Sequence, residues 1–198
     1  MNITPQEIVE TLAMVSEQNL DLRTITMGIS LNSCADEDLD RMCQKVYDRI
    51  TRQAEHLVAV AEDLEREYGI PIANKRVSVT PIAQIAACTS AQDLTPLAHT
   101  LDHAAETLGI DFLGGFSALV HKGLGDADRR LIASIPEALA TTSRVCSSVN
   151  VASTRAGINM DAVLLMAETV LEAARRTTDI QCYGAAKLVV FANMVEDS

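Results

Sequence analysis

The amino-acid sequence predicts an α/β fold in which strands and helices alternate along a single domain. Segments rich in β-branched residues recur between amphipathic segments of helical period, and turn-forming residues separate them. A regular alternation of this kind is typical of right-handed crossovers and a parallel sheet. The length of 198 residues is close to that of one domain. We therefore expect residues 1–198 to form one α/β unit with about five parallel strands.

The first element is an N-terminal helix. Thr4 is a suitable N-cap, Pro5 suits the first turn, and Glu7 stands three residues after Thr4, as in a capping box. Ile8 and Leu12 then follow at helical spacing. The sequence therefore predicts an amphipathic helix that begins at residue 5.

Four strand–helix units and a final strand follow. Gly69 and Pro71 end the second helix, Gly109 ends the third, and Pro136 is expected to kink or split the fourth. The expected strands are residues 23–31, 75–82, 110–119, 144–152 and 187–195, and the helices between them are residues 36–68, 95–108, 126–141 and 159–176.

Composition excludes several classes of function. The net charge is −11, with 27 acidic and 16 basic side chains, and only six of the residues are Phe or Tyr, with no Trp. An acidic chain with few aromatic side chains lacks the charge and the stacking platforms of a nucleic-acid binder, and it is not attracted to an anionic membrane. No apolar run is long enough to span a membrane, and the acidic N-terminus is unlike a signal peptide. The five cysteines show no C-x-x-C spacing, so we expect reduced thiols and a cytoplasmic location.

Several of the predicted strands alternate between apolar and small polar residues. Strands buried on both faces of a parallel sheet are usually apolar throughout. In the first strand, however, Ile25, Met27 and Ile29 share one face, while Thr26 and Gly28 share the other. This pattern indicates a polar face that lines a cavity or a wide barrel. An open sheet with one face in water is the alternative.

Six strings of residues cover essentially the whole chain: RTITMGISL, NKRVSVTPI, DFLGGFSALVHKG, VCSSVNVAS, GINMDAV and AKLVVFANMVED. They resemble the amino-terminal half of a widespread prokaryotic family of unknown function, the pyruvate formate-lyase-like or "PFL family" proteins. The resemblance implies a barrel of the glycyl-radical-enzyme type, in which two halves of five parallel strands make ten. This chain would supply the first half, ending at Ser198.

The resemblance also implies a partner. The family's members continue into a second half, so we expect a homo-oligomer or a partner chain to complete the barrel and to cover the edge of the fifth strand. Glycyl-radical enzymes carry a radical-storing glycine loop near their carboxyl end, and no such loop stands in this sequence. Radical chemistry is therefore not implied.

Cys146 and Arg76 are the side chains most suited to chemistry on the polar face. Cys146 lies in mid-strand, where the resemblance places a central cysteine. It is a candidate nucleophile, because Arg144 and Arg76 are cations of the same face and nearby cations favour the reactive thiolate. A buried, inert thiol is the alternative. Arg76 needs an anionic partner, which is either a small anionic ligand or an internal carboxylate.

Ligands of parallel α/β sheets bind at the carboxyl ends of the strands, where hydroxyl and amide side chains dominate here. The 153–157 loop before the last helix is a second place for an anion, or an ordinary helix cap. His99 and His103 share a helix face but have no third ligand nearby, so no metal site is expected. No cofactor motif is evident. The expected ligand-binding residues are Arg76, Ser78, Thr80, Gly114, Gly115, Ser117, Ser148, Asn150 and Asn193.

Three hypotheses of function follow. The first is an enzyme, or part of one, that acts on a small anionic metabolite through Arg76 and Cys146. The second is a ligand-binding or regulatory module that uses the same cavity without catalysis. The third is a structural half-barrel that requires a partner chain and has no site of its own.

Overall fold

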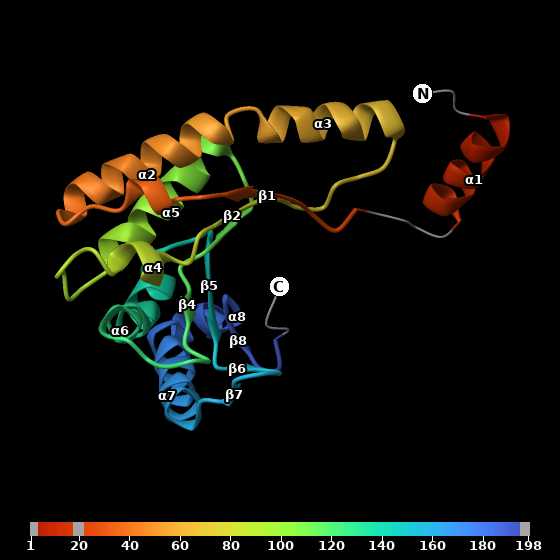
Figure 1. Ribbon diagram of the computed structural model, residues 1–198. Helices are drawn as coiled ribbons and strands as arrows, with labels where there is room; N and C mark the ends of the chain where they lie inside the picture. Colours follow the sequence, from red (N-terminus) through yellow and green to blue (C-terminus); the bar gives the residue numbers. More distant parts are fainter. Residues whose placement is uncertain (1–3, 18–21, 195–198) are drawn as a thin grey trace.

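The computed structural model describes residues 4–17 and 22–194 and has the expected α/β architecture (Figure 1). All strand pairs of the main sheet are parallel. Its strands are β1 (Ile25–Ile29), β2 (Lys75–Val79), β3 (Phe112–Gly114), β4 (Ala118–Leu119), β5 (Val145–Asn150) and β8 (Leu188–Phe191). The helices are α1 (Pro5–Ser16), α2 (Leu39–Gln53), α3 (Leu57–Tyr68), α4 (Ile82–Ala86), α5 (Thr95–Leu108), α6 (Asp126–Thr141), α7 (Met160–Arg176) and α8 (Tyr183–Ala186). Residue 195, the expected end of the last strand, lies outside the described residues.

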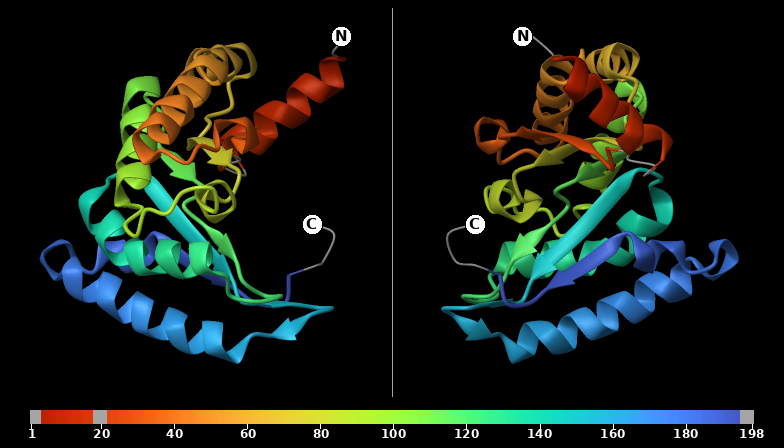
Figure 2. Two further views of the ribbon diagram at one scale, coloured as in Figure 1. Left: turned by 60° about the vertical axis from the view of Figure 1, so that its left-hand side comes forward. Right: turned by 90° about the vertical axis from the view of Figure 1, so that its right-hand side faces the viewer.

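The strands cross the sheet in the order in which they occur along the chain. β1 pairs with β2, β2 with β3, and β3 with the first residues of β5. β4 pairs with the last residues of β5 at the same edge, and β8 pairs with the opposite edge. Because crossovers between neighbouring parallel strands have one hand, a sequential order places the connecting helices on one face. Figures 1 and 2 show α2, α5 and α6 on that face, and α1 away from the sheet.

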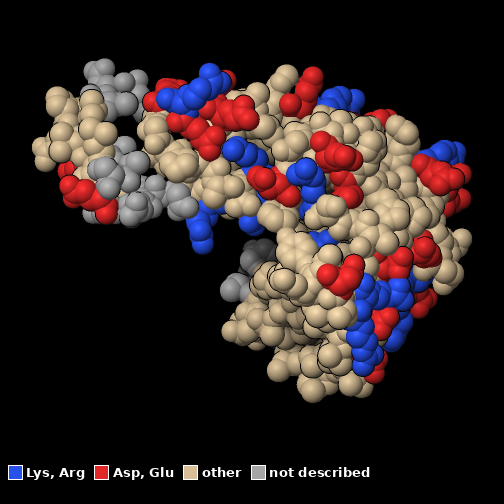
Figure 3. Space-filling view, turned by 180° about the vertical axis from the view of Figure 1, so that it is seen from behind, with Lys and Arg blue, Asp and Glu red and all other residues tan. Residues whose placement is uncertain are grey.

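The two faces of the sheet differ as the alternation in sequence predicts. The side chains of Val77, Leu113, Val145 and Val149 point to the helices and are buried in the main core. Gly28 and Ser78 on the opposite face are exposed, and Cys146 and Ser148 are half-buried. Figure 3 shows the molecule hollowed on the side that the helices leave uncovered, with basic side chains at the upper edge of the hollow and uncharged surface below it.

The prediction of one helix over residues 36–68 is wrong. α2 ends at Gln53 and α3 begins at Leu57, because the N–H of Leu57 bonds to the carbonyl of Ala54, three residues back, instead of four. Ala54 and Ala61 are both buried, so the apolar periodicity runs through the break without a change of phase. The hydrophobic pattern alone therefore does not reveal it.

Short elements were also missed. α4 follows Pro81 within the predicted strand end, and β6 (Ala152–Ser153) pairs antiparallel with β7 (Gly157–Ile158) in the predicted 153–157 loop. The predicted strand 110–119 is interrupted between β3 and β4. Pro136 lies inside α6, which continues through it from residue 126 to residue 141, so the helix is not split.

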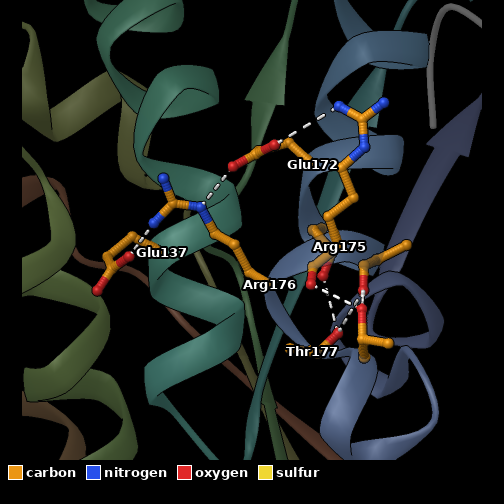
Figure 4. Close-up of polar contacts among 8 residues, drawn as sticks. Glu137, Glu172, Arg175, Arg176 and Thr177 are labelled. Carbon is orange, nitrogen blue, oxygen red and sulfur yellow. Dashed lines mark hydrogen bonds and ion pairs between the residues drawn. The ribbon is translucent and has the colours of Figure 1, made fainter.

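Arg176 links the helices α6 and α7. It lies between Glu172 on its own helix, α7, and Glu137 on α6 (Figure 4). Its Nε donates to Glu172 Oε1 at 2.8 Å, and Nη1 donates to Glu137. All three side chains are substantially exposed, so this network contributes little to stability beyond fixing the register of the two helices.

Gly115 interrupts the strand between β3 and β4. Gly114 pairs with Cys146 and Ala118 with Val149, so three residues of one strand lie opposite two of the other, as in a β-bulge. Gly115 has φ +131°, and a Cβ built there would lie 2.3 Å from Val79 Cγ2 and 2.8 Å from the Val79 carbonyl oxygen. Only glycine fits this position.

We predict that Gly115→Ala destabilises the fold by about 2–4 kcal/mol, because the new methyl group collides with the backbone of Val79 and φ is positive. Gly28→Ala is the matched control: its Cβ meets no atom within 4 Å, so the expected change is below about 1 kcal/mol. Urea unfolding of both variants measures the difference. Equal stability of the two variants would contradict the role given to Gly115.

Candidate functional site

A cavity of about 740 Å³ opens on the uncovered face of the sheet. Its lining runs from the middle of β2, β3 and β5 to the loops at their carboxyl ends. This volume is within the usual range for small-molecule sites. The lining residues are Ser78, Val79, Pro81, Gly114, Gly115, Ser117, Leu119, His121, Lys122, Cys146, Ser147, Ser148, Asn150, Ser153, Val189, Phe191 and Met194.

Most of the residues expected to bind a ligand come together around this cavity. Ser78, Gly114, Gly115, Ser117, Cys146, Ser148 and Asn150 all line it. Thr80 and Asn193 do not. The hydroxyl of Thr80 accepts a hydrogen bond from the N–H of Leu31 at 3.1 Å, so it joins two neighbouring strands, and Asn193 forms a turn with φ +62°.

The bulge at Gly115 positions a pair of hydroxyls. Ser117 Oγ lies 2.9 Å from Ser148 Oγ and accepts a hydrogen bond from the N–H of Ser148 at 3.2 Å. On the other side of the bulge, the carbonyls of Gly115 and Ser117 accept hydrogen bonds from the first N–H groups of α4, at 2.9 and 3.2 Å. The strand, the short helix and the hydroxyl pair are thus held as one unit. Two adjacent hydroxyls are suited to hydrogen bonding with a polar ligand.

Asn150 and His121 form a second polar pair at the carboxyl end of β5. Asn150 Oδ1 accepts a hydrogen bond from the N–H of Ala152 at 3.3 Å, so its Nδ2 is the atom that faces His121 Nδ1, also at 3.3 Å. Since Nδ1 accepts this hydrogen bond, the ring proton lies on Nε2. His121 therefore keeps one N–H donor on a residue that lines the cavity.

His121 and Lys122 were missed in the sequence. The signal was present, because both lie within three residues of the strand end at Leu119, and side chains after strand ends are the usual ligand contacts of parallel sheets. The apolar wall formed by Val189, Phe191 and Met194 was missed as well. In an acidic chain, the described lining contains one lysine and one histidine but no Asp or Glu.

Arg76 lies on the same face, next to the cavity but outside its lining. Its guanidinium carbon is 5.2 Å from the centre of the Phe112 ring, the residue paired with it in the neighbouring strand. Its Nε is buried and has no hydrogen-bond partner, and the described part of the chain provides no ion pair for it. A buried, unpaired donor of a cation is costly, and an anionic ligand would satisfy it.

Burial raises the pKa of the Cys146 thiol. The charges of Lys187 and Arg76 lower the pKa, but their effect is smaller than that of burial. Lys187 is 5% exposed; burial lowers its pKa in turn, and its Nζ donates to the carbonyl of Thr142. Without further positive charge from a ligand or partner, Cys146 is mainly a neutral thiol at pH 7.

The helical histidines have other contacts. His99 Nε2 lies 2.8 Å from Thr141 Oγ1, and the ring of His103 stacks on Tyr47 with 5.0 Å between the centres. Within residues 4–17 and 22–194, no group of three or more His, Cys, Asp or Glu is placed to hold a metal ion. None of the helices described is both long and apolar enough to cross a membrane.

The family to which the chain is related becomes clear from its sequence matches. Residues 13–198 match the family model described as "Uncharacterised ACR (DUF711)". The chain belongs to this uncharacterised family. The family has no assigned function, in agreement with the expectation of unknown function. The matches show no relationship to pyruvate formate-lyase.

Relatives occur in bacteria and archaea. The chain is 60% identical over 196 residues to a "UPF0210 protein" of Pelotomaculum thermopropionicum, 59% over 192 residues to one of Desulforamulus reducens, and 57% over 194 residues to one of Methanocorpusculum labreanum. These matches cover 97–99% of this chain but only 42–43% of the relatives. The chain thus spans less than half the length of the curated relatives that it matches.

We predict that Cys146 reacts with iodoacetamide at pH 7 more slowly than the exposed Cys88 and Cys182. Burial raises its pKa, so less of the thiol is ionised at neutral pH, and the rate should increase as the pH is raised. Peptide mass spectrometry after timed alkylation measures each cysteine separately, and the Cys146→Ser variant confirms the assignment. If Cys146 is the fastest of the five at pH 7, its environment is an activating one.

Proposed function

We propose that the cavity binds a small anionic metabolite. The observation that carries the proposal is Arg76, a cation on the uncovered face whose buried Nε has no partner, beside a cavity whose described lining has no carboxylate. In a chain of net charge −11, such an arrangement favours an anion at this place over the rest of the surface. Ser117, Ser148 and Asn150 would hydrogen-bond the ligand, and the 114–115 glycines would leave room for it.

The proposal concerns binding of the ligand and does not require that the ligand is transformed. Cys146 forms part of the cavity and is the group that would react if the bound ligand is also transformed. A ligand-binding or regulatory module uses the same residues without that step. The five cysteines without C-x-x-C spacing support a reducing, cytoplasmic setting for either role.

A second proposal concerns the sheet as a whole. Val189, Val190 and Phe191 of β8 are 46%, 40% and 39% exposed, and no described strand pairs with the outer edge of β8. We propose that a second chain, or the further segment that the relatives carry, adds strands there and closes a barrel like that of the glycyl-radical enzymes. The sequential strand order and the uncovered polar face support this proposal. The cavity would then become the interior of the barrel.

Binding is tested with ¹⁵N-labelled protein titrated with inorganic phosphate and with acetate. We expect shifts of the amide signals of Gly114, Gly115 and Ser148, and we expect Arg76→Met to weaken binding about tenfold, since a hydrogen bond to a charged group contributes about 1.5–3 kcal/mol. Arg52→Met, on the exposed surface of α2, removes the same charge and should leave binding unchanged. If neither anion shifts these signals, the site does not bind anions.

The strand-addition proposal is tested by the mass of the particle in solution. We expect the 198-residue chain to self-associate through β8, and Val190→Lys to shift it toward the monomer, because a lysine on an exposed strand edge opposes pairing. Leu164→Lys on α7, an exposed apolar position outside the sheet, is the control. Light scattering distinguishes the species. If the wild-type chain stays monomeric at high concentration, a second copy does not supply the new strands. The further segment that the relatives carry would then be their source, and co-expression of that segment with this chain should yield a complex.

A further inference from the structure

Basic side chains stand at both ends of the uncovered face. Arg76 lies toward the amino ends of the strands, in register with Thr26 and Phe112. His121 and Lys122 follow β4 at the carboxyl ends and line the cavity there. The two groups thus face the same space from opposite ends of the strands.

A row of small side chains lies between these two ends. Gly28, Ser78, Gly114 and Cys146 occupy one row of the register, which runs across β1, β2, β3 and β5. A Cβ built on Gly28 or on Gly114 would meet no atom within 4 Å, so the space above this row is open. The row is next to that of Arg76 on the side toward the cavity.

The cavity extends along the strands from this row to the carboxyl end. Its lining includes Cys146 and Asn150, which are four residues apart on β5 and therefore about 13 Å apart along the strand. A single small ion such as phosphate would contact one end only. The length suits an extended molecule that lies along the strands.

The groups at the two ends are held in place by other contacts. The guanidinium of Arg76 stacks on Phe112 with its buried Nε unpartnered, and Asn150 orients the imidazole of His121 so that Nε2 carries the proton. Each end thus presents a nitrogen donor suited to a carboxylate or a phosphate. The two ends are too far apart for one small anionic group to contact both, so a ligand that uses both ends needs two anionic groups.

Resting on the proposed anion-binding function, we propose that the ligand is an extended molecule with an anionic group at each end. One carboxylate or phosphate binds Arg76, and the other binds at His121 and Lys122. The chain between them crosses the row of Gly28, Ser78, Gly114 and Cys146, where there is room for a ligand without bulky branches, and continues along the cavity. The hydroxyls of Ser117 and Ser148 would hydrogen-bond a polar group in its middle.

Calorimetric titration of the 198-residue chain with matched ligands tests this inference. We expect dodecanedioate, a chain with a carboxylate at each end that is long enough when extended to reach from Arg76 to His121 and Lys122, to bind at least tenfold more tightly than dodecanoate. The two ligands have the same number of carbons and differ only in the second carboxylate, so the ratio of their affinities measures what that group adds.

Variants assign the two ends. Arg76→Met and Lys122→Met should each reduce the preference for two anionic groups to less than threefold, whereas Arg52→Met should leave it unchanged. If Arg76→Met fails to fold, as judged by circular dichroism, Arg76→Lys keeps the charge but loses the planar fork, and a loss of preference of several-fold is expected for it. Equal binding of one-group and two-group ligands would overturn this inference and leave the proposed function standing. An absence of binding by both ligands would overturn both.

Discussion

The close approach of Gly115 to the backbone of Val79 is the constraint on which the candidate site depends. It is possible only without a Cβ, and it divides one strand into β3 and β4. The extra residue of this bulge places Ser117 against Ser148, and it leaves the carbonyl of Gly115 to accept a hydrogen bond from the start of α4. A local backbone requirement thereby determines where the polar groups of the cavity stand.

The order of the strands explains why such a cavity exists. A sheet wound in one direction has all its crossovers on one side, so the opposite face receives no helix and need not be apolar. Val77, Leu113 and Val145 fill the core on the covered side, and side chains no larger than cysteine occupy the row of Gly28, Ser78, Gly114 and Cys146 on the other. The core and the candidate site thus lie on opposite faces of the same strands.

Much of this arrangement could be predicted from the sequence, because it follows from periodicity. A period of two residues revealed the covered and the uncovered face, and with them Ser78, Cys146, Ser148 and Asn150 around the cavity. What could not be predicted depends on contacts between segments distant in the chain. The break before Leu57 leaves the apolar phase intact, and Thr80 contacts Leu31 instead of the cavity because of the exact path of two strand ends. Arg76 stands beside the cavity because its side chain stacks on Phe112, which no spacing in the sequence indicates.

The open space above Gly28 and Gly114 has a consequence for how ligand preference can diverge within a family. Neither glycine has a positive φ, and neither touches a neighbour at its missing Cβ, so larger residues can be accommodated at both positions without rebuilding the sheet. Each such replacement would narrow the open space above this row of residues and leave the basic groups at both ends of the cavity in place. Two positions that tolerate exchange would thus determine how wide a molecule can lie between the two ends, while the anionic groups that it needs stay the same.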